Sequence, residues 1–202
     1  MNDPITLLVS NWPITALVVI LVVLYSLYNR LIKSRNMAQA ALSSIEIQLR
    51  KRYDLIPNVL SIAKEYMEHE KETFDQITQL RTDALKNSNA EDTNTVAKLF
   101  SDDAKLSGMM GKLMVSMEAY PELKAVESMK EAMTTYQDVE NDIAAARRFY
   151  NSAANELKNS VDIFPSSMIA SAINISTMPF YEGPDSSAIQ STINASDFFD
   201  KS

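Results

Sequence analysis

The stretch ITALVVILVVLYSL, from Ile14 to Leu27, is almost wholly aliphatic and decides how the rest of the chain is arranged. No charged residue occurs from Pro4 to Asn29, so about 20 residues can cross a hydrocarbon core of about 30 Å as a helix. Trp12 and Tyr28 would then lie at the two membrane interfaces, where aromatic belts form. We therefore predict a transmembrane anchor at residues 12–29.

A cleaved signal peptide is the alternative interpretation of the same run, and it fits poorly. The one charged residue before the run is Asp3, so a basic n-region is missing. The run also passes into Arg30, Lys33 and Arg35 without a small-residue cleavage site. Because these positive charges flank only the C-terminal side, the positive-inside rule places everything after Arg30 in the cytoplasm. Residues 1–11 would be a short extracytoplasmic N-terminus, and the chain a single-pass membrane protein.

The composition argues against several classes of ligand chemistry. The 202 residues include no cysteine, one histidine and three glycines, which leaves no thiolate zinc site, no two-histidine metal motif and no Gly-rich phosphate loop. A formal net charge of −7 argues against nucleic-acid binding, which needs a positive surface. We predict no cofactor and no metal. The expected partners are the lipid bilayer, through residues 12–29, and an unidentified protein.

The chain after the anchor has helix-forming composition, and its prolines mark the predicted joints. Only Pro57, Pro121 and Pro165 occur between Ile14 and Met178. We predict helices at residues 30–52, continuing the membrane helix, and at 55–86, 93–119 and 121–162.

Apolar residues recur in alternating steps of three and four along each predicted helix, which places them on the stripe that an antiparallel bundle buries. No segment shows strand alternation. The sequence therefore predicts an all-α fold, in which the N-terminal transmembrane helix is followed by a long antiparallel four-helix bundle at residues 30–165. The predicted core residues are Leu31, Ala38, Leu42, Ile45, Leu49, Leu60, Ala63, Met67, Phe74, Ile77, Ala84, Val96, Leu99, Leu106, Met110, Leu113, Met117, Tyr120, Met129, Met133, Tyr136, Ile143, Tyr150, Ala154, Leu157, Val161 and Phe164.

The sequence changes character at FPSS, residues 164–167. Small apolar residues follow, and then a Ser-, Asn- and Asp-rich end. We predict that residues 166–182 form a tail docked on the bundle and that residues 183–202 form a mobile C-terminal extension.

Five charged residues fall at heptad positions that should face the core. An unpaired buried charge is very costly, so we expect them to pair with one another or to turn outward. A structural salt-bridge layer that fixes helix register is the favoured interpretation, and a catalytic role is the alternative; we assign no catalytic residue. The five candidates are Glu70, Arg81, Asp103, Glu140 and Arg147.

Carboxylates inside a four-helix bundle also occur in di-iron sites, which need a Glu-x-x-His motif from each of two helices. The one histidine, His69, has Tyr66 three residues before it, so this motif is absent. Glu65 and Glu72 flank His69 at helical spacing. A weak cation site there is the alternative to a solvated charged face, which we favour.

Seven segments follow one another in order: YNRLI (28–32), IEIQLRKRYDLIPNVL (45–60), HEKETFDQIT (69–78), LSGMMGKLM through EAYPELKA (106–125), IAAARRFYN (143–151), FPSSMIA (164–170) and MPFYE (178–182). Together they resemble the LemA family of bacterial membrane proteins. The resemblance implies an N-terminal anchor in the bacterial inner or cell membrane, a helical bundle in the cytoplasm and no established enzymatic activity. The 20 residues after Glu182 depart from the family pattern.

These observations lead to two functional hypotheses. The first is a membrane-anchored, non-enzymatic helical scaffold or interaction protein. The alternative is an enzyme or cation-dependent regulator that uses the charged residues inside the bundle. Solvent access separates the two, since a scaffold needs these charges dry and paired, whereas an active site needs them open.

Overall fold

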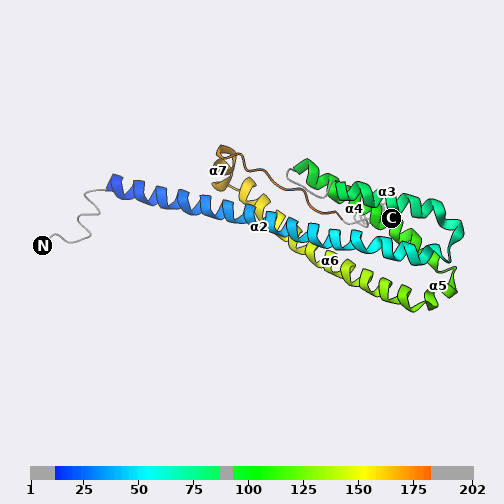
Figure 1. Cartoon of the computed structure of the whole chain (residues 1–202). Helices are drawn as coiled ribbons and strands as arrows, with labels where there is room; N and C mark the ends of the chain where they lie inside the picture. Colours follow the sequence, from blue (N-terminus) through cyan, green and yellow to red (C-terminus); the bar gives the residue numbers. More distant parts are fainter. Residues whose placement is uncertain (1–11, 87–92, 183–202) are drawn as a thin grey trace, which may run out of the picture. The chain divides into compact units, whose positions relative to one another are not determined.

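The computed structural model describes residues 12–86 and 93–182, and these residues form helices and connecting segments without a strand (Figure 1). The all-α class is confirmed for this part of the chain. The predicted extracytoplasmic residues 1–11 and the predicted mobile extension 183–202 lie outside the described residues. The helices are α2 (Trp12–Lys64), the 3-10 helix η1 (Glu68–Glu70), α3 (Lys71–Lys86), α4 (Thr93–Met117), α5 (Pro121–Ala125), α6 (Glu127–Asp162) and α7 (Ser166–Ala172).

The chain divides into two compact units, each built from two stretches of sequence. Unit 1 comprises residues 1–40 and 152–178, and unit 2 comprises residues 41–151 and 179–202. The two longest helices, α2 and α6, each contribute to both units.

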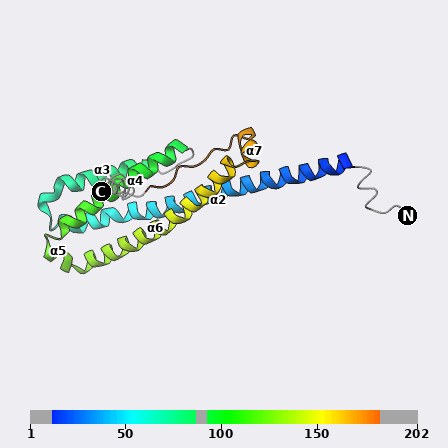
Figure 2. The ribbon, with the colours of Figure 1, turned by 180° about the vertical axis from the view of Figure 1, so that it is seen from behind.

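In unit 1, the N-terminal part of α2 has the length and composition of a membrane-crossing helix. An 18-residue window has a mean hydropathy of 1.9 and is only 6% buried. Burial begins at Leu31 and continues at Ser34 and Ala38. The end of α6 and α7 lie beside α2 (Figures 1 and 2). The buried residues that this second stretch contributes are Ala153, Ala154, Leu157, Ser160, Ala170 and Ile175.

Helix α2 continues through Pro57, where we predicted a joint between two helices. That prediction is wrong, because α2 ends only at Lys64. A proline lacks the N–H that would bond to the carbonyl four residues earlier, here the carbonyl of Tyr53. The Nε of Arg81, in α3, donates to this carbonyl at 2.5 Å. The acceptor that Pro57 leaves free within α2 is therefore satisfied by a neighbouring helix.

The predicted helix at 121–162 is divided at Val126, whose extended backbone (ψ 124°) separates α5 from α6. A β-branched residue favours such a conformation.

Burial confirms most of the predicted core. Tyr120, Met133 and Val161 are half-buried, and all the other predicted core residues are buried except Phe164. Phe164 is 73% exposed, so its prediction is wrong. The physical reason is that α6 ends at Asp162, and the helical period no longer sets the direction of a side chain beyond that residue.

Candidate functional site: a buried charged cluster

Four charged side chains from three helices meet inside unit 2. Arg52 comes from α2, Asp103 from α4, and Glu140 and Arg147 from α6. We call these four residues the charged cluster. Their two positive and two negative formal charges cancel, which reduces the cost of removing them from water.

Arg52 joins the three helices. Its side chain is fully buried, and its Nη2 donates to Asp103 Oδ1. Its Nη1 donates to Glu140 Oε1 at 2.8 Å and to Ser107 Oγ at 2.7 Å. A guanidinium suits this position because its planar fork carries donors that point to different partners.

Asp103 receives four hydrogen bonds. Its Oδ1 accepts from Arg52 and from the Tyr53 hydroxyl, at 3.3 Å for the hydroxyl. Its Oδ2 accepts from Arg147 Nη2, at 3.3 Å, and from the Tyr181 hydroxyl. A carboxylate has about four acceptor positions, so this fully buried group has none left for a substrate proton.

The segment that contains Tyr181 is held against α6 and α4. The Tyr181 N–H donates to Asn151 Oδ1 at 2.8 Å, and Asn151 Nδ2 donates to the Tyr181 carbonyl at 3.0 Å. The Tyr150 hydroxyl donates to the Pro179 carbonyl at 2.6 Å. The Tyr181 ring lies 4.3 Å from the Arg147 guanidinium carbon and 4.4 Å from the ring centroid of Phe100. The ring of Tyr181 thus covers the guanidinium of Arg147.

The charged cluster has an inner pair and an outer pair. The side chains of Arg52 and Asp103 are not exposed at all, whereas those of Glu140 and Arg147 are 26% and 19% exposed. Among the described atoms, the Nε of each arginine is buried without an acceptor. The inner pair is therefore closed to solvent, and only the outer pair reaches the surface of unit 2.

Burial and neighbouring charge change the proton affinity of the groups around the charged cluster. Burial alone lowers the pKa of Arg52, but the Tyr136 hydroxyl and the Glu140 carboxylate raise it, and the net change is upward. Burial raises the pKa of Tyr53 to about 12, although the charge of Arg52 opposes this rise. Burial also raises the pKa values of Tyr136, Tyr150 and Tyr181.

The structure brings together three of the five charged residues that we singled out: Asp103, Glu140 and Arg147. The other two have different partners. Glu70 lies in η1 and accepts a hydrogen bond from the Thr73 hydroxyl at 3.0 Å. Arg81 bonds to the Tyr53 carbonyl, and its Nη2 lies 3.8 Å from the carboxylate of Asp54.

Sequence reasoning missed Arg52 and Tyr181. The predicted stripe of residues 30–52 stopped at Leu49, and one further step of three reaches Arg52, from which a step of four reaches the buried Ile56. The signal for Arg52 was therefore present, but the predicted joint at Pro57 ended the helix too early. No periodicity could have found Tyr181, because it follows α7, the last helix in the part of the chain that the structure describes.

The remaining described surface offers other features. No three His, Asp or Glu side chains within residues 12–86 and 93–182 lie close enough to share a metal ion. A groove of about 270 Å³ lies between the end of α4 and the start of α6, and it contains no member of the charged cluster. Its lining residues are Met114, Met117, Glu118, Lys124, Met129, Lys130 and Met133.

Over the residues that the structure describes, these features define an all-α protein with one candidate membrane-spanning helix and a charge-balanced cluster whose inner pair is closed to solvent. The family model of the LemA family matches residues 41–194, which is well over half of the chain. The chain belongs to the LemA family, and the resemblance seen in its sequence segments is confirmed. Together with the candidate membrane helix, family membership supports a helical, membrane-associated protein.

Curated relatives include two kinds of protein. Magnetosome protein MamQ 2 of Paramagnetospirillum magneticum is 23% identical over 163 residues, covering 71% of this chain and 60% of that protein. Protein LemA of Metamycoplasma hominis is 24% identical over 157 residues, covering 78% and 69% respectively. Magnetosome protein MamQ of Magnetospirillum gryphiswaldense is 22% identical over 161 residues, covering 70% and 59%. The chain spans about three fifths of the length of these MamQ relatives.

Proposed function

We propose that this LemA-family chain is a membrane-anchored, non-enzymatic helical scaffold or interaction protein. In this proposal residues 12–29 cross the membrane, with residues 1–11 outside. The helical residues 30–165, with the tail at 166–182, lie in the cytoplasm and present their surface to a protein partner. The charged cluster then has a structural role, which is to fix the register of α2, α4 and α6.

The closed inner pair of the charged cluster carries this proposal. A general base must come within hydrogen-bond reach of the proton that it takes. Asp103 is fully buried and already accepts four hydrogen bonds, so a substrate would have to displace protein donors to reach it. Such an arrangement supports a structural layer rather than an active site.

A double variant tests this role in the whole protein. In Arg52→Met with Asp103→Leu, the closed pair is replaced by apolar side chains, while Glu140 and Arg147 keep their access to solvent. We expect the folded variant to retain the protein partners that crosslinking in the native membrane captures, as identified by mass spectrometry. The matched control is Arg50→Met with Asp54→Leu, which removes an exposed ion pair from the same helix.

The outcome separates the two hypotheses. If the inner-pair variant keeps its helicity and melting temperature but loses the captured partners or the cellular phenotype, while the control retains both, the charged cluster acts in function. The enzyme or cation-dependent regulator would then be preferred.

The proposed orientation has its own test. The basic residues Arg30, Lys33 and Arg35 all follow the apolar run, so reporter fusions after residue 165 should score as cytoplasmic. Protease cleavage of the helical residues 30–165 from outside intact cells would contradict this orientation. It would not contradict the proposal that residues 12–29 cross the membrane.

A further inference from the structure

Large apolar side chains are exposed in unit 1 between the end of α6 and the residue that follows α7. Ile163, Phe164 and Met168 are 58%, 73% and 67% exposed, and Ile173 is 38% exposed. We call these four residues the apolar corner. Exposed apolar side chains that lie together mark contacts with a partner or a membrane.

The sequence around the apolar corner is also free of charge. No Asp, Glu, Lys or Arg occurs from Ile163 to Tyr181. The preceding turn of α6 is different, since Lys158 and Asp162 form an exposed ion pair at 2.7 Å. Entry into an apolar phase is costly mainly for charged groups, and the apolar corner has none to desolvate.

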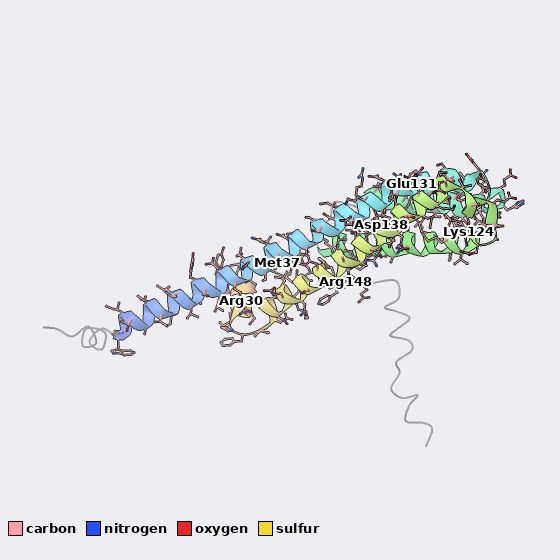
Figure 3. The ribbon with its side chains drawn as sticks, turned by 90° about the horizontal axis from the view of Figure 1, so that it is seen from below. Arg30, Met37, Lys124, Glu131, Asp138 and Arg148 are labelled. Atoms are coloured by element: carbon pink, nitrogen blue, oxygen red, sulfur yellow. The ribbon has the colours of Figure 1, made fainter. Side chains whose placement is uncertain are left out.

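The apolar corner lies beside the part of α2 where the membrane span ends. Figure 1 shows α7 next to α2, and in Figure 3 the label of Arg30 lies beside the orange helix α7. Leu31 is the first fully buried residue of α2, and the residues of α2 before it are exposed, except Thr15 and Leu27, which are half-buried. Arg30, Lys33 and Arg35 are exposed at this end of the span. Their positive charges are complementary to anionic lipid headgroups.

We propose that the apolar corner inserts into the interfacial layer of the same membrane that α2 crosses, as a second and peripheral membrane contact. The inference rests on the proposed membrane anchor. Amphipathic elements at the boundary between headgroups and acyl chains bury an apolar face to a shallow depth and gain from nearby basic residues. The apolar corner supplies the apolar face, and the basic residues of α2 supply the charge.

This contact would have a mechanical consequence for unit 1. A single helix can tilt and rotate in a bilayer, because its tilt is set by packing and interfacial anchors rather than by its length. A second contact point beside the helix restricts both motions. Because α7 lies beside α2, this second contact would fix the angle at which α2 leaves the membrane.

Tryptophan fluorescence tests the proposal in the full-length chain. Trp12 is the one tryptophan of the sequence, so Trp12→Phe gives a silent background into which Phe164→Trp introduces a single reporter. The protein is reconstituted in vesicles of phosphatidylcholine and phosphatidylglycerol, with or without bromine atoms near the headgroup end of the acyl chains. We expect the brominated lipid to quench the reporter at position 164 and its emission to shift to the blue.

A matched control uses Met37→Trp in the same background. Met37 is 41% exposed on α2 in unit 1, and it follows Tyr28 by nine residues, or about 14 Å along the helix. It is labelled in Figure 3 beyond Arg30. Its fluorescence should be the same in brominated and ordinary vesicles. If Phe164→Trp lowers helicity, Met168→Trp serves as the second reporter, because this side chain is equally open.

The outcomes distinguish this inference from the membrane anchor itself. Trp12 of the unaltered protein reports the anchor. If Trp12 is quenched but the reporter at position 164 behaves like the one at position 37, the peripheral contact is overturned and the anchor stands. If neither Trp12 nor the reporter at position 164 is quenched, both fail. A blue-shifted but unquenched reporter would mean that protein covers the apolar corner, which also overturns the proposal.

Discussion

Two arginines that are two residues apart on α2 have opposite surroundings. The side chain of Arg50 is 59% exposed and lies 3.4 Å from Asp54, whereas Arg52 is fully buried between Asp103 and Glu140. Arg52→Ala should lower the free energy of unfolding by about 3 to 5 kcal/mol, because it leaves buried carboxylates without a counter-charge. Arg50→Ala should change it by less than about 1 kcal/mol. Chemical denaturation in detergent micelles measures both values.

The double change Arg52→Met with Asp103→Leu should be more stable than Arg52→Ala in the same experiment. A buried ion pair is often no more stabilising than a well-packed apolar pair, whereas an unpaired buried charge is strongly destabilising. Recovery should be partial, because the hydroxyls of Tyr53 and Tyr181 lose their acceptor on Asp103. If the double variant is less stable than Arg52→Ala, Arg52 and Asp103 do not act as a pair.

At the residue scale, the sequence predicted which charged residues lie on core-facing helix stripes better than it predicted their partners. Heptad spacing placed Asp103, Glu140 and Arg147 on buried stripes, and the structure brings them together. Spacing within one helix carries no information about which residues of another helix lie opposite. Arg81 illustrates this, because its partner is a backbone carbonyl that no pattern of side chains reveals.

Pro57 and Arg81 form a coupled pair between α2 and α3. The proline removes one helical donor from the Tyr53 carbonyl, and the guanidinium replaces it. Arg81→Met should therefore cost about 1 to 3 kcal/mol in the natural sequence, the usual cost of an unsatisfied buried acceptor. In a Pro57→Ala background it should cost much less, because the alanine N–H can bond to the carbonyl. Denaturation of the four proteins in this cycle measures the coupling.

The control for this cycle is Asp54→Asn. Arg81 also lies 3.8 Å from the half-exposed carboxylate of Asp54, and a pair of this kind contributes little. Asp54→Asn should leave the coupling between positions 57 and 81 unchanged. Equal costs of Arg81→Met in the two backgrounds would show that the carbonyl contact does not stabilise the fold.

The segment around Tyr181 should loosen when its anchoring ring is removed. Tyr181→Ala removes the hydrogen bond to Asp103 and the contacts with Arg147 and Phe100. Backbone amides of residues 180–182 should then exchange with deuterium faster, as measured by mass spectrometry. Tyr181→Phe keeps the ring and should have a smaller effect. The control is Phe180→Ala, whose side chain is 41% exposed; an equal effect there would mean that the ring of Tyr181 is not the anchor.

At the scale of helices, composition predicted the helix ends at residues 86 and 162 and the starts at 93 and 121. It missed the break between Lys64 and Lys71, which divides the predicted helix at 55–86, and the break at Val126, and proline misled at one joint. Pro121 does begin a helix, since a missing N–H costs nothing in a first turn. Pro57 lies inside α2 because another helix replaces the lost donor, which is tertiary information. The core prediction for Phe164 failed because it extended the helical pattern two residues beyond the end of α6.

At the scale of the whole molecule, the all-α class follows from residue patterns alone. The uncharged run from Pro4 to Asn29 predicts the candidate membrane helix, and the stripes of three and four predict buried helix faces. The division into two units does not follow from these patterns. Both α2 and α6 pass from one unit into the other without a break, so no change of composition marks the boundary.

The four buried tyrosines around the charged cluster should set an upper pH limit for the fold. Burial raises the pKa of Tyr53 to about 12, and it also raises those of Tyr136, Tyr150 and Tyr181. The unfolded chain releases these protons near pH 10, so above that pH the folded state binds more protons than the unfolded state. The free energy of unfolding should therefore be independent of these groups below about pH 10 and then fall by up to about 1.4 kcal/mol per pH unit for each tyrosine.

Alkaline unfolding measured by circular dichroism, together with tyrosinate absorbance, checks this limit. Absorbance from the buried tyrosines should rise together with the loss of helicity rather than before it. Tyr53→Phe removes one ionisation from the unfolded state, so at pH 11 this variant should lose less stability, relative to its own value at pH 8, than the natural protein does. The variant and the natural protein could instead lose the same free energy of unfolding between the two pH values. Tyr53 would then ionise as easily in the folded chain as in the unfolded one, and burial beside Arg52 would not change its pKa.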